Sequence, residues 1–390
     1  MSLNFDDTKV AFQAKSKSGL MLSFLIFLSM YRPWVVSLGT SIISLALKWH
    51  LPIKWVIRGT LFEQFCGGES IADCQTKIKQ LNQFNVKTIL DYSVEGQESE
   101  KSFDHTLKEA MNAAHAAQSE EAIPFCVLKM TGLGSKSVMT KIQAGVRLTP
   151  LERQGFDRFK ERGHQIAAEI ASLNQRLLID AEESWYQDVV DDFCYELMLT
   201  HNQKQPVVYN TYQFYRHQML NNMKAGFAKM HESGCYFGAK IVRGAYMEQE
   251  RNRAQERGYV DPIQPNKEAT DRDYNEALRF AIKNLDHFSV CVGTHNEESS
   301  RLLVNLMHEN KVKNNDQRLF FAQLLGMSDN ISFKLSQEGY NVAKYVPYGP
   351  VEKVIPYLFR RAEENTSVKG QTSRELMLIR KEINRRKLNK

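Results

Sequence analysis

Short apolar runs rich in β-branched residues alternate with longer amphipathic patterns from residue 86 onward. Eight of the short runs have the length of a strand: Val86–Asp91, Phe125–Lys129, Leu177–Asp180, Val207–Asn210, Gly238–Arg243, Ser289–Thr294, Leu319–Gln323 and Val342–Tyr345. The patterns between them are long enough to be helices that connect parallel strands, as in Glu152–Leu173, Tyr212–Glu232, Asp271–Leu285 and Glu297–Glu309. Eight such repeats predict an α/β protein with a closed (βα)8 barrel.

An open doubly wound sheet is the alternative to the barrel. Such a sheet usually carries G-x-G-x-x-G after its first strand, and this chain has no such sequence there. The segment TGLGSKS at Thr131–Ser137 matches neither that fingerprint nor the phosphate-binding sequence G-x-x-x-x-G-K-[ST]. We therefore interpret it as a loop and prefer the barrel.

The pattern divides the chain into a helical arm at 1–85, a barrel domain at 86–368 and a basic tail at 369–390. In the arm, residues 18–47 carry only one charge, Arg32, which separates uncharged runs of 14 and 15 residues. Each run is shorter than the roughly 18 residues that a membrane-spanning helix needs. Two interpretations stay open for this segment, namely buried arm helices and a shallow contact with a membrane surface.

The net charge of +6 comes from the tail alone, because Lys369–Lys390 contains eight basic and two acidic residues, and 8 − 2 = 6. A neutral body argues against nucleic-acid binding. The tail could contact anionic lipid or form a solvated helix. The six cysteines are widely spaced, which indicates neither a zinc site nor disulfides and favours a reducing compartment. Met1–Lys17 lacks transit-peptide character, which favours a bacterial cytoplasm over a mitochondrial matrix.

Nearly every predicted strand ends at a polar residue, and these residues are Asp91, Lys129, Asp180, Asn210, Arg243, His295, Gln323 and Tyr345. In a (βα)8 barrel the carboxyl ends of the strands meet at one rim, where catalytic groups lie. The set has no H-E-x-x-H metal sequence and the chain has no G-x-S-x-G, so we expect no metal and no serine nucleophile. Its cations and amides could bind an anionic cofactor and an anionic substrate. A Schiff-base lyase that uses Lys129 is the alternative.

The stretch Tyr345–Asn365 combines a strand end, a turn at Gly349-Pro350 and an amphipathic helix. Beside its apolar stripe lies a second stripe formed by Tyr357, Arg360, Arg361 and Glu364. Two adjacent guanidinium groups could bind a carboxylate in a bidentate manner. A solvated face held by ion pairs is the other interpretation.

Four motifs carry a resemblance to a known family: KIVRGAYMEQER (Lys240–Arg251), GTHNE (Gly293–Glu297), QLLGMSD (Gln323–Asp329) and KYVPYGPVEKVIPYLFRRAEENTSV (Lys344–Val368). Their sequences and their order resemble FAD-dependent proline dehydrogenase in its single-function form, over roughly Val86 to Val368. The resemblance implies that L-proline is oxidised to Δ1-pyrroline-5-carboxylate by hydride transfer to FAD, with a membrane quinone as electron acceptor.

The resemblance also implies roles for individual residues. Lys129, Arg360 and Arg361 would bind the substrate carboxylate, Tyr345 would pack on the pyrrolidine ring, and Glu95 would pair with Arg360 as a lid. Catalytic positions are Asp180, Lys240 and Lys129. Flavin-binding positions are Ala181, Asn210, Lys240, Arg243, Gly244, Ala245, Thr294, His295, Gln323 and Glu364. Lys240, Asn210 and Met247 stand where relatives often carry arginine, glutamine and tryptophan, respectively.

Three further expectations follow from the resemblance. Hydroxyproline is the rival substrate, although the bulky Tyr345 favours proline. A peripheral position on the inner face of a bacterial membrane, reached through 18–47 and the basic C-terminus, is expected, with the mitochondrial matrix or inner membrane as alternative. The last helix must lie over the barrel mouth, because along the outside of the barrel it would place Arg360 roughly 15 Å from the active rim. Pro356 would help to bend this helix.

Overall fold

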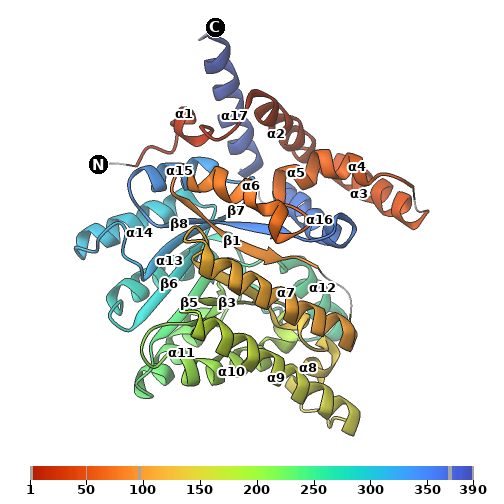
Figure 1. The fold of residues 1–390 in the computed structure, drawn as a ribbon, viewed down its shortest axis with the longest axis vertical. Helices are drawn as coiled ribbons and strands as arrows, with labels where there is room; N and C mark the ends of the chain where they lie inside the picture. The colour runs from red at the N-terminus through yellow and green to blue at the C-terminus, as the bar shows by residue number, and fades with distance from the viewer. Residues whose placement is uncertain (1–2, 50, 95–97, 368–370, 389–390) are drawn as a thin grey trace. The chain divides into compact units, whose positions relative to one another are not determined.

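The computed structural model describes residues 3–49, 51–94, 98–367 and 371–388. Eight parallel strands form a closed barrel in the order β1 to β8 (Figure 1). Their bounds are β1 Val86–Tyr92, β2 Phe125–Lys129, β3 Leu177–Asp180, β4 Val208–Gln213, β5 Phe237–Val242, β6 Phe288–Gly293, β7 Leu319–Leu324 and β8 Val342–Tyr348. The predicted (βα)8 barrel is confirmed.

Several predicted elements were wrong in their extent, among them β8, which was predicted to end at Tyr345 and ends at Tyr348. The helix expected at Tyr212–Glu232 is α11, Met219–Glu232, because Thr211, Tyr212 and Gln213 continue strand β4. Threonine and tyrosine favour the pleated, buried surface of a strand. The segment Thr131–Ser137 is not wholly a loop, since it overlaps the short 3₁₀ helix η2, Met130–Gly132, and the start of helix α8, Lys136–Gln143.

The chain forms two compact units, of which one comprises Gly96–Ala322. This unit contains β2 to β6, β7 as far as Ala322, and helices α7 Glu100–Ser119, η2, α8, α9 Pro150–Ser172, α10 Ser184–His201, α11, α12 Met247–Arg257, α13 Lys267–Lys283 and α14 Glu297–Glu309. Its strands pair in parallel, with Lys129 beside Asp180 and Thr211 beside Lys240. The rings of Phe125, Tyr209 and Phe320 meet edge to face in its core. The register therefore brings the polar ends of neighbouring strands together.

The other unit comprises Met1–Glu95 and Gln323–Lys390. Its N-terminal part contains α1 Thr8–Ala11, α2 Lys17–Met30, α3 Pro33–Lys48, α4 Lys54–Ile57, the π-helix η1 Arg58–Phe62, α5 Glu63–Phe65, α6 Ile71–Asn82 and β1. Its C-terminal part contains the end of β7, α15 Asp329–Gln337, β8, α16 Val351–Ser367 and α17 Gln371–Leu388. Strands β1 and β8 pair in parallel, and α2 contacts both α16 and α17. The division at 85/86 and 368/369 that the sequence suggests stays a prediction.

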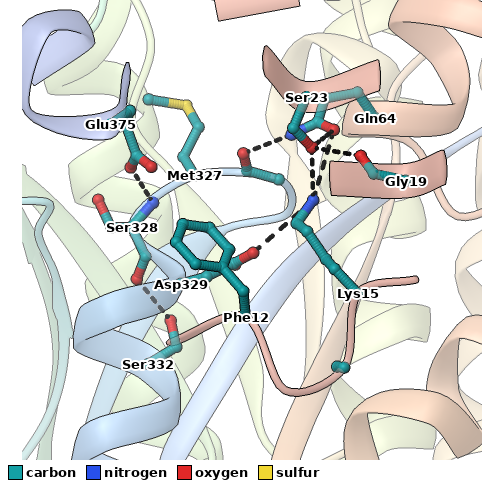
Figure 2. A network of polar contacts seen from close by, with 12 residues as sticks. Phe12, Lys15, Gly19, Ser23, Gln64, Met327, Ser328, Asp329, Ser332 and Glu375 are labelled. Carbon is teal, nitrogen blue, oxygen red and sulfur yellow. Dashed lines mark hydrogen bonds and ion pairs between the residues drawn. The ribbon is translucent and has the colours of Figure 1, made fainter. Parts of the chain in front are cut away.

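A group of four charges joins distant parts of this second unit, and Figure 2 shows three of them, Lys15, Asp329 and Glu375. The Asp329 carboxylate lies between two lysines, with Lys344 Nζ 2.9 Å from Oδ1 and Lys15 Nζ 3.8 Å from Oδ2. The fourth member, Glu375 on α17, accepts a hydrogen bond of 2.5 Å from the backbone N–H of Ser328. We call these four residues, Lys15, Asp329, Lys344 and Glu375, the four-charge cluster.

Helix α17 is fastened to the N-terminal segment by its own cations. Arg374 Nη1 lies 2.8 Å from Asp6 Oδ1, and Lys381 donates to the Asp6 carbonyl at 2.8 Å. Arg386 donates to the carbonyls of Phe12 and Lys15 at 2.8 and 2.9 Å. These basic side chains of the tail therefore bind this chain's own backbone and carboxylates.

Helices α2 and α3 cover most of the apolar segment 18–47. Neither these nor any other single helix among the described residues has the length and apolar character to cross a membrane. Lys17–Met30 and Trp34–Ala46 meet the length and composition criteria only as a pair, which is bent by 102°. The inner face of α2 is buried, at Leu20, Ile26, Phe27 and Met30.

Candidate active site

Three charged side chains meet at the carboxyl ends of β2, β3 and β5. Lys240 Nζ donates a hydrogen bond of 2.5 Å to Asp180 Oδ1, and Lys129 Nζ lies 4.0 Å from Asp180 Oδ2. The side chains of Lys129, Asp180 and Lys240 are only 17%, 14% and 7% exposed. We call them the lysine–aspartate triad. Two ammonium groups and one carboxylate sum to a charge of +1, which suits an anionic substrate.

The strand register explains why these three residues meet. Lys129 and Asp180 are neighbours in the pairing of β2 with β3. Lys240 on β5 is one strand further away, and its neighbour on the intervening β4 is Thr211. The Thr211 side chain is short, and its hydroxyl donates to the Ile179 carbonyl at 2.6 Å. The long Lys240 side chain can therefore reach Asp180 across β4.

A carboxyl group that the sequence analysis missed lies next to this triad. Glu182 is buried and accepts hydrogen bonds from the Thr131 hydroxyl at 2.6 Å and the Thr131 N–H at 3.2 Å. Burial raises the pKa of Glu182 to about 7, although the bonds from Thr131 and the charge of Lys129 oppose the rise. The run Asp180-Ala181-Glu182-Glu183 directly after a strand was the available signal. The site thus contains a group that titrates near neutral pH.

Arg243 holds the ends of β5 and β6 to the helices that follow them. Its guanidinium donates to Asp271 Oδ1 at 2.7 Å, Thr294 Oγ1 at 2.8 Å and Ser299 Oγ at 2.9 Å. It also lies over the Tyr274 ring, 4.2 Å from the centroid. Two predicted flavin-binding residues, Arg243 and Thr294, are therefore brought together, and His295 follows directly. Their contact with a cofactor stays a prediction.

Gly244 follows Arg243 with a backbone φ of +129°. A Cβ at this position would lie 1.9 Å from atoms of the Tyr215 ring. Only glycine fits such a backbone conformation and such a close approach. The structure thus supplies a reason for glycine within the chain itself, and Ala245 follows it half-buried.

The β4 end contains one predicted flavin-binding residue and one that was missed. Asn210 donates to Asp191 Oδ1 at 3.0 Å, and its own Oδ1 accepts from the Thr211 N–H at 2.9 Å. Burial raises the pKa of Asp191 to about 6, against the hydrogen bonds from Gln187 and Asn210. Asn210 is thus engaged with Asp191, and its predicted cofactor contact stays untested.

Gln213 lies three residues further along β4, and its Nε2 is 3.5 Å from the carbonyl of Ala181, the residue after Asp180. Within the described ranges of the chain, Gln213 Oε1 is buried without a hydrogen-bond partner, as are Nε and Nη1 of Arg216. A buried polar atom without a partner costs about 1–3 kcal/mol. An amide acceptor and a guanidinium left unsatisfied here fit a cofactor that offers hydroxyl groups and phosphates.

The remaining predicted site residues belong to the unit that contains β8 and α16. Tyr345 on β8 and Arg361 on α16 are each 7% exposed, whereas Arg360 is half-buried. The Arg361 guanidinium lies over the Tyr357 ring at 5.2 Å. The interpretation of this stripe as a solvated face is therefore wrong for Tyr357 and Arg361. The placement of α16 over the barrel mouth stays a prediction.

Three other predicted residues on this unit are less informative or cannot be assessed. Gln323 is buried, and its Oε1 accepts from the Ser332 hydroxyl at 2.8 Å. Glu95 lies outside the described residues, and so does the side chain of Glu364.

Metal and thiol chemistry find little support in the described residues. No group of three or more His, Cys, Asp or Glu side chains is placed there to hold a metal ion. The six cysteines are buried and free. For Cys66, Cys74, Cys126, Cys194 and Cys291, burial raises the pKa of the thiol, so these cysteines are poor nucleophiles at neutral pH.

A sequence model described as proline dehydrogenase matches residues 74–374. The chain belongs to the proline dehydrogenase family. The family and the oxidoreductase class predicted from the motifs are thereby confirmed, and a lyase based on Lys129 loses its support.

Relatives within the proline dehydrogenase family extend the match along the chain. Mitochondrial proline dehydrogenase 1 of Dictyostelium discoideum is 30% identical over 97% of this chain and 74% of its own length. Human mitochondrial proline dehydrogenase 1 is 41% identical over 62% of this chain, which spans only 40% of the human protein. Hydroxyproline dehydrogenase of Xenopus laevis is 29% identical over 100% of this chain and 91% of its own length. Both substrate types thus occur among its relatives.

A solved structure of the same fold is proline utilization A from Bdellovibrio bacteriovorus. It superposes with a TM-score of 0.72 at 19% identity, over 92% of this chain and 38% of the other. At this identity the likeness supports the barrel fold and nothing finer.

Proposed function

We propose that this member of the proline dehydrogenase family oxidises L-proline to Δ1-pyrroline-5-carboxylate with FAD as the cofactor. The observation that carries the proposal is the lysine–aspartate triad at the ends of β2, β3 and β5, whose charge of +1 suits the carboxylate of an amino acid. The Asp180 carboxylate fixes Lys240 by a direct hydrogen bond and holds Lys129 nearby. The two ammonium groups are thereby preorganised.

FAD would be held by residues at the ends of β3 to β6. Gln213 and Arg216 offer buried polar atoms that lack protein partners within the described ranges, and Gly244 keeps the backbone after β5 free of a side chain. We assign the further contacts to the positions that match the family: Ala181, Asn210, Lys240, Arg243, Ala245, Thr294, His295, Gln323 and Glu364. Bound FAD would accept a hydride from C5 of proline, and loss of the nitrogen proton completes the C5–N double bond.

The substrate carboxylate is assigned to Lys129, Arg360 and Arg361, with Tyr345 against the ring and Glu95 as a lid. The buried position of the Arg361 guanidinium supports this assignment, because a fixed and desolvated cation binds a carboxylate strongly. Replacing Arg361→Ala should raise the apparent substrate constant at least about tenfold, as expected for loss of about 1.4 kcal/mol. An unchanged constant, measured by steady-state kinetics with a dye acceptor, would remove Arg361 from the clamp.

A membrane quinone would be the final electron acceptor, and the chain would meet the membrane as a peripheral protein. The apolar segment 18–47 supports this part of the proposal. The inner face of a bacterial membrane and the mitochondrial inner membrane are both consistent with it, and several relatives are named as mitochondrial.

One anaerobic titration tests the central proposal. The purified protein should show the absorbance bands of bound flavin, and stepwise addition of L-proline should bleach them without oxygen. The same titration with hydroxyproline should require a higher concentration, because Tyr345 leaves less room for the added hydroxyl. Flavin bands that proline does not bleach would overturn the proposal, and bleaching by hydroxyproline alone would reassign the substrate. Borohydride treatment with substrate should trap no adduct on Lys129.

A further inference from the structure

The exposed face of helix α3 is apolar, whereas the exposed face of a surface helix is normally polar. Trp34, Leu38, Ile42 and Leu45 follow one face at intervals of four, four and three residues, and they are 62%, 53%, 57% and 48% exposed. In a surface helix such a stripe normally faces the core. Here it is exposed along about three turns.

The same character continues on the helices next to it in the chain. More than half of the large apolar side chains that are exposed among the described residues lie between 21 and 56. We call this set the apolar arm surface: Met21, Leu25, Leu28, Tyr31, Trp34, Leu38, Ile42, Leu45, Trp49, Leu51, Trp55 and Val56. It lies on α2, α3 and α4 and on the segments between them, and all three helices contact α16 (Figure 1). An exposed patch of this extent indicates an interaction site.

The charged residues within this segment of the chain have one sign. Residues 8–62 contain no aspartate or glutamate but seven lysines or arginines: Lys9, Lys15, Lys17, Arg32, Lys48, Lys54 and Arg58. Lys54 and Arg58 pair with Glu352 and Glu69, and Lys15 is in the four-charge cluster. Arg32 and Lys48 are exposed at the two ends of α3. An apolar stripe with a cation at each end has the charge pattern that anionic lipid attracts.

Two other observations favour a bilayer over a second copy of the chain. Three of the four tryptophans, Trp34, Trp49 and Trp55, belong to the apolar arm surface, and tryptophan is enriched at the boundary between water and lipid. A two-fold dimer would bring the exposed Arg32 and Lys48 of both copies to one interface, where like charges repel.

We infer that the apolar arm surface docks onto an anionic lipid bilayer, with α3 lying in the headgroup region and its Trp34–Leu45 stripe facing the acyl chains. The proposed transfer of electrons to a membrane quinone would explain why the protein binds a membrane, and only this part of the inference rests on the proposed function. It assigns no lipid contact to the C-terminal helix, since Arg374, Lys381 and Arg386 already bind Asp6, Phe12 and Lys15. The basic composition of residues 369–390 alone predicts a lipid contact there.

The test measures binding of the full-length protein to vesicles of phosphatidylcholine with one quarter phosphatidylglycerol, without proline or quinone. In a Trp185→Phe background all tryptophan emission comes from the apolar arm surface. We expect a blue shift on vesicle addition and quenching by brominated acyl chains. Pure phosphatidylcholine vesicles or 0.5 M salt should weaken binding, because the headgroup charge contributes.

The variant Leu38→Ser/Ile42→Ser/Leu45→Ser should lower the partition coefficient at least about tenfold, since three buried aliphatic side chains are lost from the contact. The control variant Leu151→Ser/Val260→Ser removes two apolar side chains that do not belong to the apolar arm surface and are more exposed than the three replaced residues. It should bind vesicles like the parent protein. Circular dichroism and proline-dependent reduction of a soluble dye confirm that each variant is folded.

Two outcomes would overturn the inference. One is equal vesicle binding by the triple variant and the parent protein, or no binding by either. The other is concentration-dependent dimerisation, seen by sedimentation, that the triple variant abolishes while vesicles have no effect. Because binding is measured without substrate, a protein that docks on lipid but does not oxidise proline would refute only the proposed activity.

Discussion

The lysine–aspartate triad and the four-charge cluster share one arrangement but differ in charge balance. In each, an aspartate lies between two lysines, at 2.5 and 4.0 Å around Asp180 and at 2.9 and 3.8 Å around Asp329. The cluster adds a second carboxyl group, Glu375. Its lysines also donate to other protein groups, Lys344 to the Met327 carbonyl at 2.5 Å and Lys15 to the Ser23 hydroxyl at 2.9 Å.

The difference separates an arrangement that can balance its own charges from one for which we propose a role in substrate binding. When all four groups are ionised, the four-charge cluster sums to zero and needs no ligand. The three groups of the lysine–aspartate triad sum to +1 while the neighbouring Glu182, whose pKa is raised to about 7, is protonated. The substrate carboxylate proposed above would offset that charge. Burial of a charge is costly unless it is paired, which makes the cluster sensitive to the loss of any of its charges.

The largest effect is expected from Asp329→Asn. The change leaves Lys344, whose side chain is 0% exposed, without its carboxylate partner. Breaking a buried pair in this way should lower the free energy of unfolding by about 3–5 kcal/mol, measured by urea denaturation. The control Asp286→Asn, at a side chain that is 96% exposed, should cost less than about 0.5 kcal/mol. Equal losses in both variants would contradict a structural role for the cluster.

The pH dependence of stability separates two glutamates on α17. Burial, and next the charge of Asp329, raise the pKa of Glu375 to about 7 in the folded protein. The unfolded chain therefore releases this proton first as the pH rises, and stability should fall between about pH 4.5 and 7, by roughly 3 kcal/mol. Glu375→Gln should remove this fall, as measured by denaturation at several pH values.

Glu382 on the same helix provides the opposite case. Burial alone would raise its pKa, but hydrogen bonds from Arg385 and Arg386 keep the pKa of Glu382 below its ordinary value. Its contribution to stability is present above the ordinary pKa and is lost as the pH falls. Glu382→Gln should therefore destabilise the protein most at neutral pH. If both glutamine variants changed the pH profile in the same direction, the assigned environments would be wrong.

Asp180→Asn tests the other half of the comparison. The amide keeps the shape but not the charge that positions Lys240 and Lys129, so kcat/KM for proline should fall about 100-fold, in the range seen when a preorganised electrostatic contact is removed. The loss of unfolding free energy should be smaller than for Asp329→Asn. An Asp180→Asn enzyme with full activity would show that the triad takes no part in catalysis.

The smallest effect is expected for the lysine that lies farther from the aspartate in each group, Lys129 in the triad and Lys15 in the cluster. Lys129→Met should raise the apparent substrate constant about tenfold, because a charge-assisted contact with the carboxylate is lost. Lys15→Met removes a lysine at nearly the same distance from its aspartate, 3.8 against 4.0 Å, and should leave this constant unchanged. A matching rise in both variants would point to a general loss of structure.

The sequence predicted the triad but not the cluster, for a physical reason. Lys129 and Asp180 stand at strand ends, and parallel strands in a barrel bring those ends together whatever the details of packing. Lys15, Asp329, Lys344 and Glu375 have no common position in the repeat. They come from a loop before a helix, a helix start, a strand and the tail, so only tertiary packing brings them together.

Residues near the end of β4 show a second limit. Asn210 was chosen because the predicted strand ended there, whereas β4 continues to Gln213. Strand ends are the least certain part of a pattern-based assignment. Because β4 is three residues longer than predicted, the amide at its end is Gln213 and not Asn210. Glu182 was missed because its raised pKa depends on burial and on Thr131, neither of which the sequence displays.

The contacts of α17 with the N-terminal segment have a consequence for synthesis. Arg386 binds the carbonyl of Phe12, 374 residues earlier, and Lys381 binds that of Asp6. At about 5–20 residues per second, a ribosome needs roughly 20–75 seconds to make the intervening chain. During this interval α1 and α2 lack the helix that fastens them, and their apolar residues are open to chaperones. The contacts that fasten this arm to α17 can therefore form only after α17 has been synthesised.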